Sequence, residues 1–173
     1  MSQIGLELGA DVPFFIFGVP ALVQGIGEKV EPLALNLDGY EILLLFPPEC
    51  CSTPLMYKAY RDLHPDIENA ESEFDSTRVM EIFEVHAQTN PLAMLVDNDF
   101  EEVIDKDFPV IAGLLRHLRS DGQACASLSG SGSTIFVLQS GEKAISLDFE
   151  NYVSRIAKQH SAGLRKARIL SKQ

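Results

Sequence analysis

The sequence predicts an α+β domain of the ferredoxin-like, split βαβ type, and two observations carry this prediction. A continuous apolar run of strand length, Tyr40–Phe46 (YEILLLF), stops at Pro47–Pro48 and is followed by helical spacing of apolar residues. From Tyr40 onward the order of segments is strand, helices, strand, strand, helix and strand. With the extra helices taken as an insertion in the first crossover, this is the order of a split βαβ sandwich.

The segment before the turn-like break at Asn36–Gly39 consists of short apolar pieces. Ser2–Leu8 resembles the end of a helix, and a loop follows it. Glycine-containing turns then separate three strand-like runs, Pro13–Phe17, Ala21–Gly25 and Lys29–Leu35. A set of strands this small needs a partner to pack against, so we expect exposed apolar surface here.

The later elements follow from capping and spacing signals. Thr53–Pro54 places an N-cap residue before a proline, so we expect a helix from there to Leu63. Amphipathic spacing predicts further helices, and short β-branched or apolar runs predict further strands. The expected helices are Thr77–Gln88, Asn90–Ile104, Pro109–Asp121 and Asp148–Gln159, and the expected strands are Ala124–Leu128, Thr134–Leu138 and Arg165–Leu170.

Composition and charge disfavour several classes of function. The 173 residues are 46% hydrophobic and 23% charged, as in packed globular proteins. The 25 acidic residues outnumber the 14 Lys and Arg, giving a net charge of −11 that disfavours nucleic-acid binding. There is no signal-peptide pattern and no apolar stretch of bilayer length, so we expect a cytoplasmic protein with no membrane partner. Cys50, Cys51 and Cys125 have neither disulfide-framework nor zinc spacing, so reduced thiols and no metal site are expected.

Two short segments are candidates for chemistry. Ser129–Ser133 (SGSGS) lies between two expected strands, and its glycines would let backbone N–H groups converge on an anion. The alternative is a turn that merely needs small residues. Asp11 stands two residues before Pro13 and could take a proton from a hydroxyl. The alternative for Asp11 is a turn aspartate that bonds local N–H groups.

Taken together, three segments resemble the GHMP kinase superfamily. They are LGADVPFF at Leu8–Phe15, GIGE at Gly25–Glu28 and LSGSGSTIF at Leu128–Phe136. Two more matches, STPLMY at Ser52–Tyr57 and NDFE at Asn98–Glu101, favour the branch that phosphorylates the 2-hydroxyl of 4-diphosphocytidyl-2-C-methyl-D-erythritol. The resemblance covers essentially the whole chain and implies an enzyme of non-mevalonate isoprenoid precursor biosynthesis.

The resemblance also implies roles for individual residues. Asp11 matches the aspartate that activates the substrate hydroxyl for attack on the γ-phosphate of ATP. Substrate-binding roles are implied for Gly9 and Ala10, in the loop that presents Asp11, and for Thr53, Pro54 and Tyr57, around the cytidine. A ring at position 57 would stack on cytosine, although a half-buried packing aromatic is the alternative. Gly130, Ser131 and Gly132 match the third superfamily motif, which packs against the nucleotide phosphate loop, so a cofactor-binding role is implied for them, with a structural role as the alternative.

The resemblance implies ATP and Mg²⁺ as cofactors and a small-molecule substrate with a cytidine diphosphate group. Members of this superfamily run to about twice this length, as a domain pair. Residues 1–36 are therefore interpreted as a remnant of the N-terminal GHMP kinase domain, and residues 37–173 as the C-terminal domain.

No PxxxGLGSSA-like phosphate loop occurs in the sequence, so the missing N-terminal region is expected to be needed for a complete site and the chain alone to be inactive. Two alternatives remain open: a non-catalytic small-molecule-binding domain of the same fold, or a GHMP kinase acting on homoserine, mevalonate or a sugar.

Overall fold

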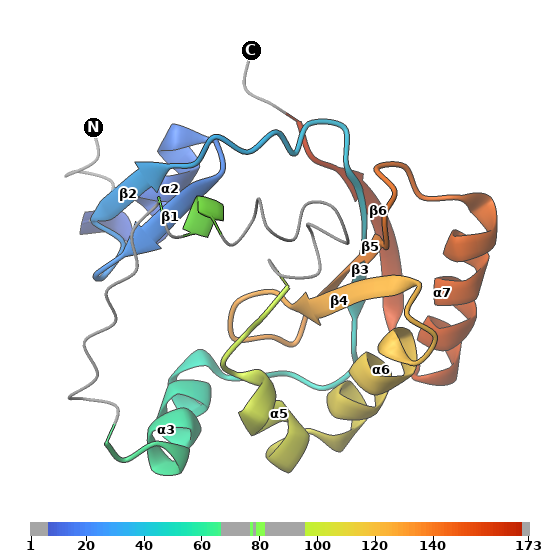
Figure 1. Ribbon diagram of the computed structural model, residues 1–173. Coiled ribbons are helices and arrows are strands. Elements are labelled where there is room, and N and C mark those ends of the chain that lie inside the picture. The colour runs from blue at the N-terminus through green and yellow to red at the C-terminus, as the bar shows by residue number, and fades with distance from the viewer. Residues whose placement is uncertain (1–6, 67–76, 78, 82–95, 171–173) are drawn as a thin grey trace.

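The larger part of the structure is a four-stranded antiparallel sheet covered by helices (Figure 1). The computed structural model describes residues 7–66, 77, 79–81 and 96–170. The strands are β3 (Glu41–Phe46), β4 (Ala124–Leu128), β5 (Ile135–Gln139) and β6 (Gly163–Arg168), in the order β4-β5-β3-β6. Every neighbouring pair is antiparallel. This order is that of a ferredoxin-like sandwich, which confirms the predicted fold class.

Strand β3 lies inside the sheet, with one face buried and the other partly covered. Leu43 and Leu45 are fully buried in the main core, which buried side chains of the covering helices complete. Ile42 packs on the opposite face against a smaller apolar cluster around Cys125 and Leu138. Because successive side chains of a strand point to opposite faces, burial on both faces requires a continuous apolar run rather than alternation.

The helices over the sheet are α5 (Glu101–Asp107), α6 (Pro109–Arg119) and α7 (Leu147–Gln159). Helix α6 begins with Pro109 and buries Ile111, Leu114, Leu115 and Leu118, which recur at helical spacing on one face. Helix α7 begins at a side-chain cap, in which Phe149 N–H donates to Ser146 Oγ at 3.2 Å. These two helices and the neighbouring α3 (Thr53–Leu63) confirm the predicted positions to within a few residues.

The N-terminal segment forms a separate small unit, coloured blue in Figure 1. It contains α2 (Val12–Phe17) and an antiparallel hairpin of β1 (Ala21–Gln24) and β2 (Lys29–Pro32). The predicted strand at Pro13–Phe17 is therefore wrong. Proline occupies the first turn of this short helix, and Gly18 ends it with φ 63° while donating its N–H to Phe14 O at 3.1 Å.

The hairpin unit exposes apolar side chains, as expected. The side chains of Leu8, Phe15 and Ile26 are each more than 70% exposed. The predicted third strand is also shorter than expected, because pairing stops at Pro32, opposite Ala21. Within the described residues, no helix is long and apolar enough to cross a membrane.

Two further expectations need correction or lie partly beyond the described residues. The predicted helix Asn90–Ile104 is wrong for Val96–Asn98, which are not helical, and α5 begins only at Glu101. The physical reason is an Asx turn, in which Asn98 Oδ1 accepts the N–H of Phe100 at 3.0 Å. Of the predicted helix Thr77–Gln88, residues 77 and 79–81 are helical and the others lie outside the described residues, as do 90–95 and most of Ser2–Leu8.

Candidate active site

Asp11 stands at the start of α2, on the short loop that precedes it. Its backbone carbonyl accepts the N–H of Phe15 at 3.3 Å, and the carbonyl of Gly9 accepts the N–H of Val12 at 3.2 Å. The Asp11 side chain caps no helical N–H and is exposed. The loop of Gly9 and Ala10 thus presents the Asp11 carboxylate, which accepts no hydrogen bond from the first N–H groups of the helix.

The GIGE turn packs directly on the Asp11 loop. A Cβ atom added at Gly27 would lie 2.7 Å from the carbonyl carbon of Ala10 and closer still to its oxygen. Gly27 also has φ +100°, a conformation that L side chains rarely adopt. Glu28 closes the same turn, because its carboxylate accepts the N–H of Ile26 at 2.7 Å. Two of the segments that carried the resemblance are therefore in backbone contact.

The SGSGS segment forms the tight loop between β4 and β5. Gly130 and Gly132 have φ 59° and φ 83°, so this backbone path favours glycine at both positions. Ser129 N–H donates to Thr134 O at 2.8 Å, and Gly132 N–H donates to Ser129 O at 3.1 Å. Ser131 is half-buried, whereas Gly130 is exposed.

The first turn of α3 lies against this loop. Thr53 Oγ1 and Ser131 Oγ are 2.7 Å apart, a hydrogen bond between residues 78 positions apart in sequence. Pro54 occupies the next position and is exposed. One turn further, Tyr57 is 52% exposed, and its ring stands edge to face with Phe100 at a centroid distance of 4.9 Å. Tyr57 thus offers ring surface to a ligand while Phe100 supports it.

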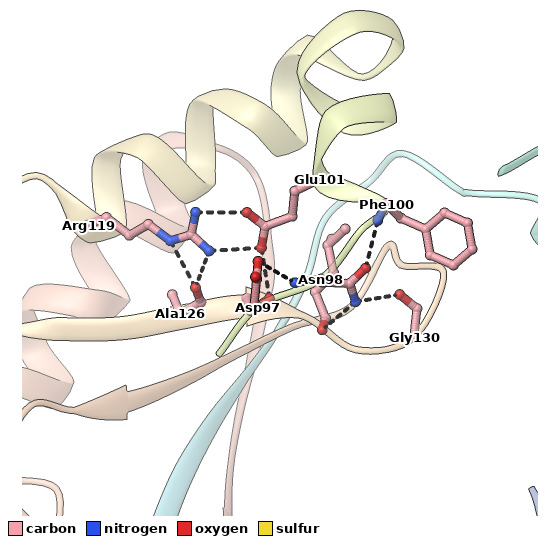
Figure 2. Close-up of polar contacts among 9 residues, drawn as sticks. Asp97, Asn98, Phe100, Glu101, Arg119, Ala126 and Gly130 are labelled. Carbon is pink, nitrogen blue, oxygen red and sulfur yellow. Dashed lines mark hydrogen bonds and ion pairs between the residues drawn. The ribbon is translucent and has the colours of Figure 1, made fainter. Parts of the chain in front are cut away.

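Asn98 joins the loop to the tyrosine side of the site, and the sequence had singled it out only within NDFE. Its Nδ2 donates to the carbonyl oxygens of Leu128 at 3.2 Å and Gly130 at 2.9 Å (Figure 2). Its Oδ1 accepts the N–H of Phe100, whose ring contacts Tyr57 and also Tyr60 at 5.9 Å. The predicted helix Asn90–Ile104 ran through Asn98, so only the NDFE match drew attention to this residue.

A second set of contacts fixes α5, which follows Asn98. Arg119 donates from both terminal nitrogens to the carboxylate of Glu101, each at 2.8 Å, and from Nε to Ala126 O at 2.9 Å (Figure 2). The hydroxyl of Ser127, which is fully buried, donates to Glu101 Oε1 at 2.7 Å. Bidentate arginine–carboxylate pairs are geometrically specific, so this brace sets where α5 begins relative to β4.

A cavity of about 370 Å³ opens beside this cluster, lined by Tyr57, Tyr60, Asp97, Asn98, Asp99, Phe100 and Gly130. Burial, aided by the charges of Asp99 and Glu102, raises the pKa of Tyr60, so its phenol stays protonated at neutral pH. Burial also raises the pKa of the nearby Cys51 thiol, with help from Glu49, which makes a thiolate nucleophile unfavourable there. Because aromatic rings and the carboxylates of Asp97 and Asp99 line the cavity, it suits a ligand that stacks on rings and donates hydrogen bonds.

A larger cavity of about 640 Å³ lies away from these groups, between α2 and the end of β6. Its lining is mainly apolar and includes Phe14, Phe15, Leu33 and Ile169. None of its described lining residues carries a hydroxyl group, whereas Tyr57 and Tyr60 line the smaller cavity. The chemistry of the predicted site residues therefore points to the smaller one.

The structure brings five of the nine predicted site residues into one cluster. Thr53, Tyr57, Gly130, Ser131 and Gly132 lie around Asn98 and Phe100, with Pro54 beside Thr53. Gly9, Ala10 and Asp11 lie on the α2 loop, and across the described part of the chain no hydrogen bond joins the Asp11 side chain to the cluster. Among the residues that the structure describes, no group of three or more His, Cys, Asp or Glu could hold a metal ion.

The chain is similar to curated 4-diphosphocytidyl-2-C-methyl-D-erythritol kinases. The relative from Citrifermentans bemidjiense is 33% identical over 144 residues, which are 83% of this chain and 47% of that protein. The relative from Bacteroides fragilis is 33% identical over 151 residues, 87% of this chain and 51% of that protein. The chain thus spans about half the length of the curated relatives it matches. No family model matches the sequence.

A solved structure gives the same assignment for the fold. The crystal structure of a 4-(cytidine 5'-diphospho)-2C-methyl-D-erythritol kinase superposes with a TM-score of 0.66 and is 27% identical. The match covers 95% of this chain and 55% of that one, so it includes both the hairpin unit and the four-stranded domain. Sequence and fold thus confirm the resemblance that the motifs carried, and the chain is similar to the 4-diphosphocytidyl-2-C-methyl-D-erythritol kinases over about half of their length.

Proposed function

We propose that this chain is the C-terminal part of an ATP-dependent kinase acting on 4-diphosphocytidyl-2-C-methyl-D-erythritol. The reaction transfers the γ-phosphoryl group of ATP to the 2-hydroxyl of that substrate, in non-mevalonate isoprenoid precursor biosynthesis. The observation that carries the proposal is the 2.7 Å contact between Thr53 and Ser131. It joins the STPLMY segment, expected at the cytidine, to the SGSGS loop, expected at the nucleotide phosphates.

Asp11 is proposed as the catalytic residue. Phosphoryl transfer depends mostly on positioning and on stabilisation of charge, with one group to orient or deprotonate the attacking hydroxyl. An exposed carboxylate that caps no helical N–H is available for that role. Gly9 and Ala10 fix its loop, and the close approach of Gly27 limits how far this loop can move.

The glycine–serine loop is proposed to lie beside the phosphates of ATP. Its hydroxyls and backbone N–H groups are neutral donors, which suit phosphate oxygens. Mg²⁺ would be held chiefly by the phosphates themselves, as in many kinase sites, and we assign it no ligand from the described residues. The described residues fit a supporting role toward ATP, so a phosphate cradle from the N-terminal region is needed to complete the site.

Tyr57 is proposed to stack on the cytosine ring of the substrate. Its half-exposed side chain can meet a base, while Phe100 supports its ring in a T-shaped contact. Stacking of this type contributes about 1–3 kcal/mol per base. Thr53 and Pro54 would border the same group. The neighbouring carboxylates Asp97 and Asp99 line the cavity and favour a ligand group that donates hydrogen bonds, such as the cytosine amine.

We further propose that residues 1–36 complete an N-terminal kinase domain and that residues 37–173 form the C-terminal domain. The hairpin of β1 and β2 supports this boundary, because it forms a sheet of its own apart from the four-stranded sheet. The exposed apolar side chains of Leu8, Phe15 and Ile26 suit a larger sheet partner. We place the protein in the cytoplasm.

The proposal is tested by a panel of acceptors in a completed protein. This chain is joined at Met1 to the N-terminal half of a curated relative, and phosphorylated products are identified by mass spectrometry. We expect ATP-dependent phosphorylation of 4-diphosphocytidyl-2-C-methyl-D-erythritol and a Tyr57→Ala variant with a raised KM for that substrate but not for ATP. Turnover of homoserine, mevalonate or a sugar instead contradicts the proposed substrate. Binding of cytidine diphosphate compounds without turnover of any acceptor indicates a binding domain.

A further inference from the structure

The Asn98 side chain donates hydrogen bonds to two carbonyl groups at the glycine–serine loop. Its Nδ2 lies 3.2 Å from Leu128 O, at the end of β4, and 2.9 Å from Gly130 O, at the tip of the loop. The two donors of one amide therefore connect the tip of the loop to the end of β4. The acceptor of the same amide is used by Phe100 N–H at 3.0 Å, so all these bonds share one rigid group.

Holding the Gly130 carbonyl also fixes the direction of the next N–H. The Gly130–Ser131 peptide is trans, and in a planar trans peptide the C=O and N–H bonds point in opposite directions. Because the Gly130 oxygen faces Asn98, the Ser131 N–H faces away from it. The Ser131 side chain is held separately, through the 2.7 Å contact with Thr53 Oγ1.

We infer that Asn98 is a positioning residue of the proposed kinase, which turns the Ser131 N–H outward as a donor for a phosphate oxygen of the nucleotide. The inference rests on the proposed function, because it takes a nucleotide as the ligand. Both ends of the Asn98 amide are committed to backbone groups of the protein. It acts through the Gly130–Ser131 peptide, and the Glu101–Arg119 brace fixes the segment that carries it.

The test uses Asn98→Asp in the full 173-residue chain. The carboxylate keeps the Oδ1 acceptor for Phe100 N–H but replaces the donor with an oxygen facing two carbonyls, so it releases the loop alone. Asn36→Asp is the matched control, because Asn36 Oδ1 likewise accepts an N–H two residues on, from Asp38 at 3.0 Å. The added charge is the same in both variants.

The chain carries its own reporters of loop position. Cys51 Sγ would lie 3.3 Å from a Cβ added at Gly132, so this half-buried thiol packs against the loop, whereas Cys125 is buried on β4. In a Cys50→Ser background, alkylation rates of both thiols are measured by mass spectrometry. A released loop exposes Cys51 only, while general unfolding exposes both. The amide NMR signal of Ser131 is then followed as ATP is added to the completed protein, in which the N-terminal half of a curated relative supplies the phosphate cradle.

We expect Asn98→Asp to raise the alkylation rate of Cys51 about tenfold, as the loss of two hydrogen bonds predicts, with Cys125 unchanged. We also expect ATP to shift the Ser131 amide signal in the completed protein and in its Asn36→Asp variant, but not in its Asn98→Asp variant. The inference is overturned by an unchanged Cys51 rate, by equal increases at Cys51 and Cys125, or by a Ser131 amide that ATP does not move. The acceptor panel in the completed protein then decides the kinase proposal separately.

Discussion

Replacing Gly27 with alanine tests the contact between the GIGE turn and the loop that carries Asp11. The new Cβ would lie 2.7 Å from the carbonyl carbon of Ala10, whereas ordinary contacts begin at 3.4 Å. The two segments must therefore separate by at least about 0.7 Å, and the carbonyl oxygen, which is closer, demands more. The positive φ of Gly27 adds strain of about 1–2 kcal/mol for an L residue.

Displacement on this scale predicts a specific pattern of effects. A misplacement of about 1 Å costs roughly a hundredfold in rate, so the completed kinase with Gly27→Ala should lose about that factor in kcat. In the 173-residue chain, hydrogen exchange of the β1 and β2 amides should accelerate while that of β3–β6 stays unchanged.

Gly39→Ala is the control for strain alone, because Gly39 has φ +80° but no atom within 4 Å of its added Cβ. Equal effects of the two substitutions on kcat and on exchange of the hairpin would refute the contact between the turn and the Asp11 loop.

Two further predictions concern stability. Arg119→Ala removes the bidentate bond to Glu101 and the bonds to Ala126. With solvent screening included, this loss should lower the free energy of unfolding by about 2–3 kcal/mol and Tm by roughly 5–10 °C. Arg116→Ala, which removes an exposed pair with Asp105, should leave Tm within about 2 °C, and equal losses would contradict the brace. Hydrogen bonds from Arg168, the Ile145 N–H and Lys166 lower the pKa of Glu41 from 4.5 to about 2. The contribution of Glu41 to the free energy of unfolding is therefore present above pH 4.5 and lost as the pH falls toward 2. As the pH is lowered through this range, the urea unfolding midpoint should fall less steeply in Glu41→Gln than in the unsubstituted chain. Midpoints that fall in parallel in the two proteins would contradict this role.

The ferredoxin-like domain could be predicted because its signals are local and agree with its packing. The apolar run within Tyr40–Phe46 fits a strand with one face buried and the other packed against a smaller cluster. The run at Pro13–Phe17 gave no such guidance, since a few consecutive apolar residues fit a strand or a buried helix equally well. The helix there ends at Gly18 in a left-handed conformation, which distinguishes it from a strand but is visible only in the structure.

The site was predictable in part for a related reason. Gly130, Ser131 and Thr53 stand in motifs with short, distinctive composition, and the fold places them together. The role of Asn98 depends on carbonyl groups 30 and 32 positions away, and a hydrogen bond of this kind leaves no periodic pattern in the sequence. The Ser127–Glu101–Arg119 brace escaped prediction in the same way, because its members lie on three different elements.

The central claim is that this chain supplies the catalytic carboxylate of a small-molecule kinase. The most direct measurement is phosphoryl transfer from ATP to 4-diphosphocytidyl-2-C-methyl-D-erythritol by the completed protein with Asp11→Asn, alongside ATP affinity by calorimetry. Asparagine keeps the shape of Asp11 but removes its charge, so we predict that turnover falls by a factor of about 10²–10⁴ while ATP binds as before. Turnover at the unsubstituted rate would show that Asp11 is not the catalytic base.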